Sequence, residues 1–390
     1  MSWSKVLAAT TIGLMSCLAP VSAALAAPAP AAVTTKAPPA PALSAAAAVV
    51  LDVQSGQLLF GRNTHTRRAP ASTTKIMTGL LAVESGRLDE VVTISKRAAS
   101  IGEATIYLKE GEQLTLRELT YGVLLSSGND ASTAVAEFVA GSEAKFVEMM
   151  NERAKELGLT NTHFNNPHGL PAEDHYSTAY DLAQLLRVAI QNPEWQAIAA
   201  TKWKKVPLQG KADGRTLKNH NKLLWSYPYA SSGKTGYTFA AGRCFVGSAK
   251  KGNRQVVQTV LGAPDLWADA QKMLAYGLDN FENLLVARRG EVVGTVPIQA
   301  GSNRVVEVIA PRDVSVCLPR GTVDSANLQQ VWQLPDELVA PVEENQTVGK
   351  LIVRQGDKVL TSVPLVAATA VPIASGAWEH ISSWFFPGML

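Results

Sequence analysis

Residues 70–78 read PASTTKIMT, and the interpretation of the whole chain starts from this stretch. Apolar residues recur at helical spacing through residues 73–84, which predicts a helix there. Ser72 and Lys75 stand three positions apart at its start, so their side chains share one face. A serine becomes a nucleophile when a base takes its proton, and a lysine kept neutral by burial can act as that base. Ser72 could also be no more than an N-cap residue.

Two more motifs follow in order along the chain. Ser127-Gly128-Asn129 falls in the break between two expected helices, where a hydroxyl could relay a proton and an amide could hold a peptide group. Lys234-Thr235-Gly236 falls at the end of an expected strand, where a lysine can attract a carboxylate and a glycine allows close approach. Each motif alone is more simply a turn. Together with the first motif, and in this order, they form the set used by penicillin-recognising serine enzymes.

The regions around these motifs predict an α+β fold. Strand patterns flank a long helical insertion, so the hairpin at its start is expected to join the later strands in one antiparallel sheet. The segment from residue 115 opens with a capping box, Thr115-x-x-Glu118. The expected strands are 45–53, 58–60, 231–234, 243–248 and 255–261, and the further helices are 115–125, 130–140, 143–157, 178–191 and 265–281.

The pattern changes after residue 283. Short strand-like runs separated by Gly, Asp, Asn and Pro replace the helical periods, at residues 292–293, 305–309, 314–318 and 351–353. This predicts a small all-β domain, a sandwich or a barrel. The expected boundaries are 44–283 for the catalytic domain and 284–367 for the β domain.

The two ends of the chain differ in composition from the middle. Residues 1–26 have a positive start, an uncharged apolar stretch and a closing Ala24-Leu25-Ala26, which predicts an export signal. Residues 27–43 are rich in proline and alanine and are expected to form an extended tether. In residues 368–390, Trp378, Ile381 and Phe385 recur at helical spacing, which predicts an amphipathic helix on a membrane surface; a helix docked on the β domain is the alternative.

Charge and cysteine content exclude some classes of protein. The chain has 390 residues with 36 Lys+Arg and 33 Asp+Glu, and a net charge of +3 gives no electrostatic footprint for nucleic acid. Cys17 lies in the expected signal, and Cys244 and Cys317 are far apart, so free packed thiols are expected. No cofactor or metal is expected: His163, His168 and His175 do not have the spacing of a helical zinc-ligand pair.

The motifs and their flanks resemble the low-molecular-mass penicillin-binding proteins that act as serine D-alanyl-D-alanine carboxypeptidases. The likeness covers about residues 45–283 and, more loosely, the β domain. Beyond residues 70–78 it rests on residues 126–131 (SSGNDA), 157–164 (LGLTNTHF), 166–170 (NPHGL) and 175–183 (HYSTAYDLA). The resemblance implies a penicillin-binding, β-lactamase-like transpeptidase domain followed by an all-β domain, in an exported protein held at the outer face of the cytoplasmic membrane.

The resemblance also implies a role for each site residue. Ser72 would attack the bond between the two terminal D-alanines of a peptidoglycan stem peptide, with Lys75 as base, and β-lactam antibiotics would acylate the same hydroxyl. Ser127 would pass the proton to the leaving D-alanine. Substrate binding would fall to Asn129, Lys234, Thr235, Gly236 and Tyr237, with the backbone N–H groups of Ser72 and Tyr237 forming the oxyanion hole.

This chain departs from the pattern of its relatives at three positions. His220 stands between two asparagines where relatives often have arginine, and Ala104 stands where they often have serine. Relatives also often carry a carboxylate-binding arginine after the strand that here ends at residue 261, but residues 261–281 contain none. Lys234 therefore carries the contact with the carboxylate alone, or Arg243 contributes to it.

Two other functions compete with a carboxypeptidase. A β-lactamase would use the same catalytic set but needs rapid deacylation, usually through a dedicated Glu; Glu173 lies in a plausible loop, yet Ser177 replaces the expected Asn four residues on. A catalytically silent wall-binding protein is the other alternative. The intact Ser72 and Lys75 argue against it.

Overall fold

The computed structural model describes residues 38–322 and 328–374. The expected export signal at 1–26 lies outside the described residues, as does the tether up to residue 37. Residues 38–43 belong to no helix or strand. The side-chain hydroxyl of Tyr276 donates to the Pro38 carbonyl at 3.4 Å.

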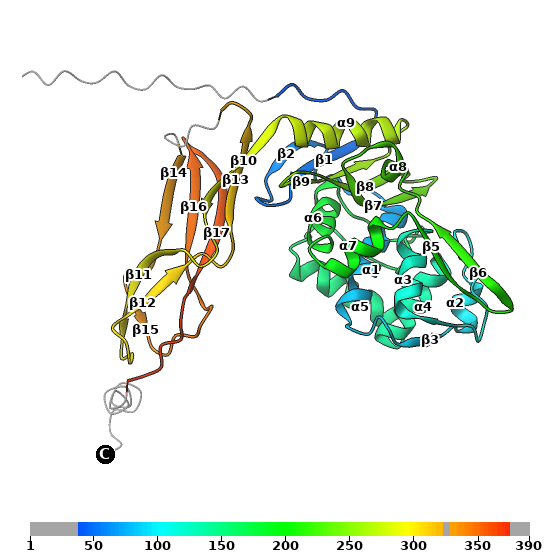
Figure 1. Ribbon diagram of the computed structural model, residues 1–390, viewed down its shortest axis with the longest axis horizontal. Coiled ribbons are helices and arrows are strands. Elements are labelled where there is room, and N and C mark those ends of the chain that lie inside the picture. Colours follow the sequence, from blue (N-terminus) through cyan, green and yellow to red (C-terminus); the bar gives the residue numbers. More distant parts are fainter. Residues whose placement is uncertain (1–37, 323–327, 375–390) are drawn as a thin grey trace, which may run out of the picture. The chain divides into compact units, whose positions relative to one another are not determined.

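A five-stranded antiparallel sheet forms the centre of the first domain (Figure 1). The expected hairpin pairs with the later strands, which confirms that part of the fold prediction. The strands follow the order β2-β1-β9-β8-β7, so β7 lies at one edge. Their bounds are β1 Ala47–Asp52, β2 Leu58–Arg62, β7 Ala230–Thr238, β8 Gly242–Lys251 and β9 Arg254–Leu261.

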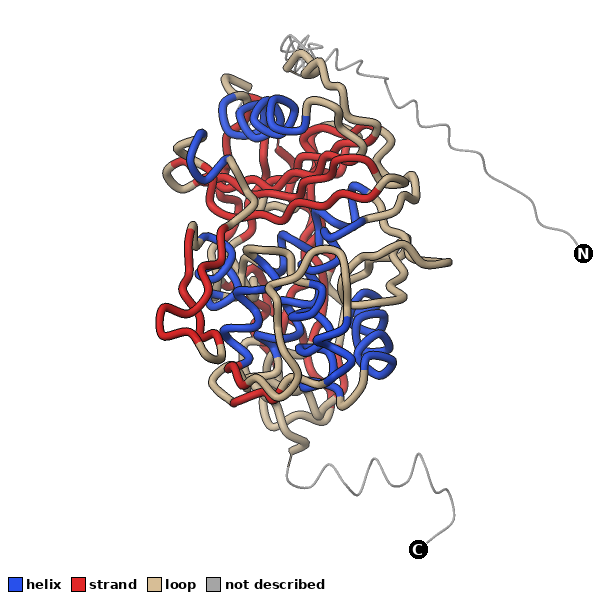
Figure 2. The backbone as a smooth tube through the Cα atoms, turned by 90° about the vertical axis from the view of Figure 1, so that its right-hand side faces the viewer, coloured by secondary structure: helices blue, strands red, loops and turns tan. Residues whose placement is uncertain are grey.

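Helices cover both faces of this sheet. The helix α9 (Leu266–Asp279) packs on one face against β8 and β9, and a larger helical group covers the other (Figure 2). In β1, Val49 and Leu51 pack with the larger group, whereas Ala48 and Val50 pack on the α9 side. Burial on both faces explains the continuous apolar run at residues 45–53. The larger group contains α1 Lys75–Glu84, α3 Leu116–Leu124, α4 Asn129–Ala140, α5 Glu143–Glu156, α6 Ala179–Ala189 and α7 Pro193–Ala200.

The helix predictions hold to within a few residues. The capping box at the start of α3 is formed, with the Thr115 side chain accepting from the Glu118 backbone N–H and the Glu118 carboxylate accepting from that of Thr115. Several short elements have no counterpart in the sequence prediction. They are β3 Val91–Thr93, α2 Lys96–Ser100, β4 Gln113–Thr115, α7, α8 Leu223–Ser226 and the hairpin of β5 Trp203–Leu208 with β6 Lys211–Lys218.

The second domain is all-β, as expected. A two-stranded sheet and a six-stranded sheet share one apolar core, which includes Val316 from the first and Val306 and Leu351 from the second. The strands are β10 Phe281–Ala287, β11 Val292–Gln299, β12 Val305–Ile309, β13 Val314–Pro319, β14 Leu328–Gln333, β15 Leu338–Val339, β16 Thr347–Gln355 and β17 Lys358–Ala367.

The start of the expected carboxyl-terminal helix is different in the structure. Residues 368–374 contain two isolated β-bridges, Val342 with Val371 and Gly301 with Ile373, in place of helix. Trp378, Ile381 and Phe385 lie outside the described residues. Within residues 38–322 and 328–374, no helix is long and apolar enough to cross a membrane.

Candidate active site

Ser72 lies in a short 3-10 helix, η1 (Ala71–Thr74), and α1 begins at Lys75. The predicted helix start is thus a tighter turn that leads into the helix proper. Pro70 occupies the cap position of η1, and the turn has no side-chain cap, so the N-cap explanation of Ser72 does not apply. The turn still brings the two side chains together, with Lys75 Nζ 3.1 Å from Ser72 Oγ.

The Lys75 amine is completely buried and has two acceptors. Its Nζ donates to Asn129 Oδ1 at 2.7 Å and to the His168 carbonyl at 2.6 Å. Burial, and then the nearby positive charge of Lys234, hold the pKa of Lys75 well below its ordinary value of 10.5. A neutral lysine amine beside a serine hydroxyl is the arrangement that activates a nucleophile.

Ser127 is presented by a strained backbone between α3 and α4. Its φ is +61°, in the left-handed region that non-glycine residues rarely adopt. Such strain is stored where the surrounding structure requires one orientation. Lys234 Nζ donates to Ser127 Oγ at 3.0 Å and to the Thr235 carbonyl at 2.8 Å. Burial lowers the pKa of Lys234 to about 7.

The strand β7 carries Lys234, Thr235 and Gly236 in its interior and continues to Thr238, whereas the sequence predicted that the motif ends a strand. Gly236 lies directly against η1. A Cβ at this position would stand 3.0 Å from the Ser72 backbone N and 3.1 Å from the Pro70 carbonyl oxygen. The absence of a side chain therefore lets the edge strand approach the nucleophile.

Asn129 is less free than its expected role suggests. Its Oδ1 accepts from Lys75, and its Nδ2 donates to the Gly102 carbonyl at 2.9 Å. The next residue, Asp130, accepts from the backbone N–H groups of Ile106 and Leu108 at 3.0–3.1 Å. Asp130 thereby fixes the loop that carries Ala104, a role that sequence reasoning missed because a buried carboxylate on backbone N–H groups leaves no motif.

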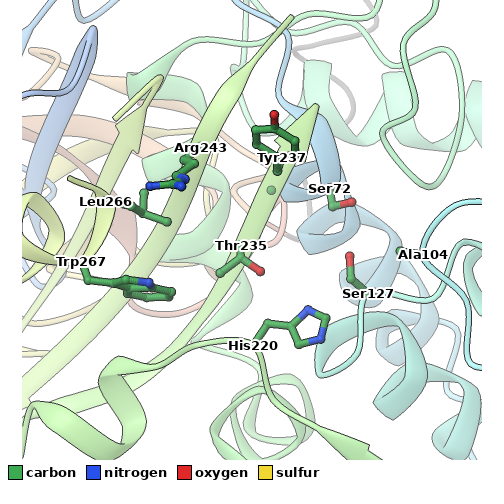
Figure 3. A pocket seen from close by; sticks show the side chains of 10 residues that line it. Ser72, Ala104, Ser127, His220, Thr235, Tyr237, Arg243, Leu266 and Trp267 are labelled. Carbon is green, nitrogen blue, oxygen red and sulfur yellow. The ribbon is translucent and has the colours of Figure 1, made fainter. Parts of the chain in front are cut away.

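Ser72, Ser127 and Thr235 line one cavity of about 530 Å³, whereas Lys75, Asn129 and Lys234 lie behind its described lining. Figure 3 shows Thr235 and Tyr237 on one side of it and Ser72 and Ser127 on the other, with His220 at one end. No Asp or Glu belongs to the described lining, which consists of Ser72, Ala104, Ser127, His220, Thr235, Gly236, Tyr237, Arg243, Leu266 and Trp267. The three sequence motifs thus meet at one site.

Residues 32–265 match the D-alanyl-D-alanine carboxypeptidase family of S11 peptidases. The chain belongs to this family. Residues 281–372 match the carboxyl-terminal domain of penicillin-binding protein 5. The match with the peptidase family covers all three sequence motifs, from Ser72 to Gly236, and Tyr237.

Bacterial relatives match over most of the chain. The chain is 36% identical over 332 residues to D-alanyl-D-alanine carboxypeptidase DacF of Bacillus subtilis, covering 83% of this chain and 85% of that one. It is 34% identical to DacD of Escherichia coli, with 87% and 90% covered. Penicillin-binding protein 5 of Haemophilus influenzae has a similar solved structure, with a TM-score of 0.73, 29% identity, and 86% of this chain and 99% of that chain covered. The chain is therefore a serine-type carboxypeptidase of this family.

Two of the three histidines considered as zinc ligands, His168 and His175, have structural contacts in this carboxypeptidase. Thr74 Oγ1 lies 2.9 Å from His175 Nε2, and the His168 backbone carbonyl holds Lys75. Burial lowers the pKa of His168 to about 3 and that of His175 to about 4, so both are neutral at pH 7. No group of side chains within the described part of the chain could hold a metal ion.

His220 occupies the position where relatives of the carboxypeptidase family often have arginine. The flanking asparagines hold its turn, because Asn219 Nδ2 donates to the Thr201 carbonyl at 2.9 Å and the Leu223 N–H donates to Asn221 Oδ1 at 3.1 Å. His220 is exposed and lines the cavity. Partial desolvation is the larger cause, and the charges of nearby lysines the smaller one, that lower the pKa of His220 to about 4. His220 therefore brings no positive charge to the site at pH 7.

Arg243 lines the cavity from the neighbouring strand. It stands opposite Tyr237 in the β7–β8 register, and its Nη1 donates to the Pro264 carbonyl at 2.9 Å. Pro264 follows the strand β9, in the segment where relatives often carry their arginine. The structure thus brings a guanidinium to this segment from a different strand. Within the described residues, Arg243 forms no salt bridge.

Proposed function

We propose that the protein removes the terminal D-alanine from peptidoglycan stem pentapeptides through an acyl-enzyme on Ser72, and that penicillin acylates the same hydroxyl. The observation that carries the proposal is the environment of Lys75. Its amine touches Ser72 Oγ, Asn129 Oδ1 and the His168 carbonyl, and its pKa is depressed.

The identity of these three partners determines where the lone pair of a neutral Lys75 points. Carbonyl oxygens can only accept, so the two N–H bonds of the neutral amine go to Asn129 and His168. The remaining tetrahedral direction holds the lone pair, which faces the Ser72 hydroxyl. Ser72 then donates its proton to Lys75 as its oxygen attacks the substrate carbonyl. Asn129 acts here as a positioning residue for the base, in addition to its expected contact with the substrate amide.

The remaining bonds form and break within the cavity. Ser72 Oγ bonds to the carbonyl carbon, and the backbone N–H groups of Ser72 and Tyr237 stabilise the oxyanion. The C–N bond to the terminal D-alanine breaks, and that amine receives a proton through the Ser127 hydroxyl, which Lys234 holds at 3.0 Å. Water then releases the shortened peptide from Ser72.

The substrate carboxylate is assigned to Lys234 and Thr235. A carboxylate that approaches Lys234 favours the charged amine and raises its pKa from the value of about 7 that burial imposes. Binding of the substrate acid and protonation of Lys234 therefore reinforce each other. The Lys234 amine keeps its hydrogen bond to the Ser127 hydroxyl during these steps.

Penicillin tests this proposal directly. The intact mass of the protein, followed over time with excess penicillin, is expected to show one long-lived adduct that peptide mapping places on Ser72. The same preparation is expected to release D-alanine from a soluble stem pentapeptide. Ser72→Ala should form no adduct, whereas Ser126→Ala, one residue away from Ser127, should form it because Ser126 Oγ donates only to the Lys218 carbonyl.

The other functions predict different results in this experiment. Rapid turnover of penicillin with a transient adduct would identify a β-lactamase, although Glu173 is exposed and does not line the cavity. A protein that forms no adduct and releases no D-alanine would be a catalytically silent wall-binding protein. Either outcome would overturn the proposed function.

Arg243 is proposed to share the carboxylate with Lys234. Arg243→Ala should raise KM for a peptide ending in D-alanine about fivefold, the scale of one exposed charge pair, and leave kcat nearly unchanged. Penicillin methyl ester lacks the carboxylate, so its acylation rate should not change. Arg304→Ala, another exposed arginine outside the site, is the matched control. An unchanged KM in the Arg243 variant would assign the carboxylate to Lys234 alone.

Location is also part of the proposal. The sequences at 1–26 and 375–390 support export and a peripheral hold on the outer face of the cytoplasmic membrane. An enzyme that trims stem peptides has its substrate on that side of the membrane.

A further inference from the structure

A cluster of tryptophan and lysine side chains lies on the hairpin β5–β6, the residue before it and the short helix α8, outside the catalytic cavity. Trp203 and Lys218 stand opposite each other in its register, so they share one face. Lys218 Nζ lies 4.8 Å from the Trp203 ring centre and 5.9 Å from that of Trp225. Lys202 Nζ lies 5.9 Å from the Trp225 ring, and Lys205 shares the face of Trp203 two residues on. We call these five residues the Trp–Lys face.

The two indole rings are exposed although the hairpin has a core of its own. Trp203 is 52% exposed and Trp225 43%, and their ring centres lie 6.2 Å apart in an edge-to-face arrangement. The opposite face of the hairpin packs against the domain through buried Val206 and Leu217. The tryptophans are thus not needed to fill that core, and two neighbouring exposed indoles form a patch that an interaction partner could cover.

The charge on this face has one sign. Within residues 38–322 and 328–374, Lys202, Lys205 and Lys218 form no salt bridge with a carboxylate. Lys218 stands beside two aromatic rings, so an anion that binds it also contacts the rings. The face therefore suits a partner that combines flat apolar ring surfaces with regularly placed carboxylates.

A hollow continues the face. A cavity of about 630 Å³ shares Lys202 and Trp225 and extends past Gln196, Ser226 and Ser231. Its polar side chains and backbone suit a hydroxyl-rich ligand. Together, the face and the hollow provide an elongated surface rather than a single small pocket.

The Trp–Lys face also adjoins the catalytic cavity. Ser126 Oγ donates to the Lys218 carbonyl at 3.3 Å, and the next residue along the chain is Ser127. His220, two residues after Lys218, lines the cavity itself. A polymer held on this face therefore lies beside the site in which its own side branches would react.

We propose that the Trp–Lys face binds the glycan strand that carries the stem peptides. Sugar rings present flat C–H surfaces that pack on indole rings. The lysines pair with the carboxylates of the stem peptides spaced along the strand, or with the lactyl carboxylates that removal of the peptides exposes. The inference rests on the proposed action on stem peptides and adds a second site for the same polymer. Lys218 above the Trp203 ring also argues against membrane insertion, because a charged amine would be carried into the hydrocarbon with the ring.

The test uses glycan strands from which the stem peptides have been removed, so that the catalytic cavity has no ligand. The full chain is expected to bind them, and the double variant Trp203→Ala/Trp225→Ala should bind at least about tenfold more weakly, as for aromatic residues central to an interface. Lys205→Gln and Lys218→Gln should each reduce the salt dependence of binding. Trp332→Ala removes another exposed tryptophan, 37% exposed on β14, and should change nothing.

Acylation by penicillin separates this inference from the proposed function. The tryptophan variant should acylate Ser72 and cleave a short soluble peptide at the wild-type rates, while its KM for polymeric substrate rises. Wild-type glycan binding by the double variant, or by both lysine variants, would overturn the inference. So would tryptophan-dependent binding to vesicles of anionic lipid without binding to glycan. Failure of Ser72 to acylate in the wild-type chain would instead overturn the proposed function.

Discussion

Lys75→Met is expected to reduce the acylation of Ser72 by penicillin by a factor on the order of 10³, the scale of a lost general base. Methionine has nearly the volume of the lysine stem but cannot accept the serine proton. The residual rate comes from the oxyanion N–H groups and from substrate binding, which the variant keeps. Stopped-flow measurement of adduct formation gives the rate, and Lys145→Met, an exposed lysine in α5, is the matched control.

The same variant should change the pH dependence of the rate. In the wild type, acylation falls as pH falls through the pKa of Lys75, because the protonated amine has no lone pair for Ser72. That pKa lies well below 10.5, so the acid limb lies at lower pH than it would for an ordinary lysine. The slow residual reaction of Lys75→Met should lack this acid limb. A variant with near wild-type acylation, or with the same acid limb, would mean that another group is the base.

Stability provides an independent check on the buried amine. The folded pKa of Lys75 lies below its unfolded value of about 10.4, so between the two values the unfolded chain binds a proton that the folded chain does not. Stability therefore rises with pH across that window. Lys234, with a folded pKa of about 7, acts in the same direction. Thermal unfolding from pH 7 to pH 10 should show a smaller rise in Tm for Lys75→Met than for the wild type.

The sequence predicts those parts of the fold that depend on periodicity. The apolar run at 45–53 becomes a strand buried on both faces, and the capping box at Thr115 opens α3. The hairpin β5–β6 was missed because its strands do not alternate cleanly between apolar and polar residues. One inward position is Arg215, which pairs with Glu112. Both side chains are charged although they are buried, so the sequence pattern indicates an exposed position where the structure has a buried one. An ion pair across 103 positions has no local pattern.

The candidate site was predictable where side chains carry its chemistry. Ser72, Lys75, Ser127 and Lys234 were all named from motif order, and the structure brings their side chains together. The parts contributed by backbone were not predictable. The carbonyl that orients Lys75 belongs to His168, whose imidazole was considered only as a zinc ligand and rejected, and any residue type has a carbonyl. Arg243 reaches its segment through strand pairing, which only the register reveals.

Gly169 is one backbone position with a large expected effect. Its φ is +86°, and a Cβ there would lie 2.0 Å from the Ala71 carbonyl oxygen and 3.0 Å from the Ser72 backbone N. The η1 turn cannot stay in place against a side chain at that distance. Gly169→Ala should reduce acylation of Ser72 by about 100-fold or more, because a shift of about 1 Å in a reacting group has that cost. The Tm of this variant should also be lower than that of the wild type.

Gly158→Ala separates this contact from backbone strain. Gly158 also has a positive φ, +69°, but a Cβ there would meet nothing within 4 Å. Its substitution should cost only the strain of a left-handed alanine, about 1–2 kcal/mol of stability, with the acylation rate unchanged. If both variants lose stability equally and both acylate normally, the close contact with Ala71 does not hold the nucleophile in place. Loss of acylation in Gly169→Ala alone shows that the loop at 166–170 positions the reacting serine as well as orienting its base.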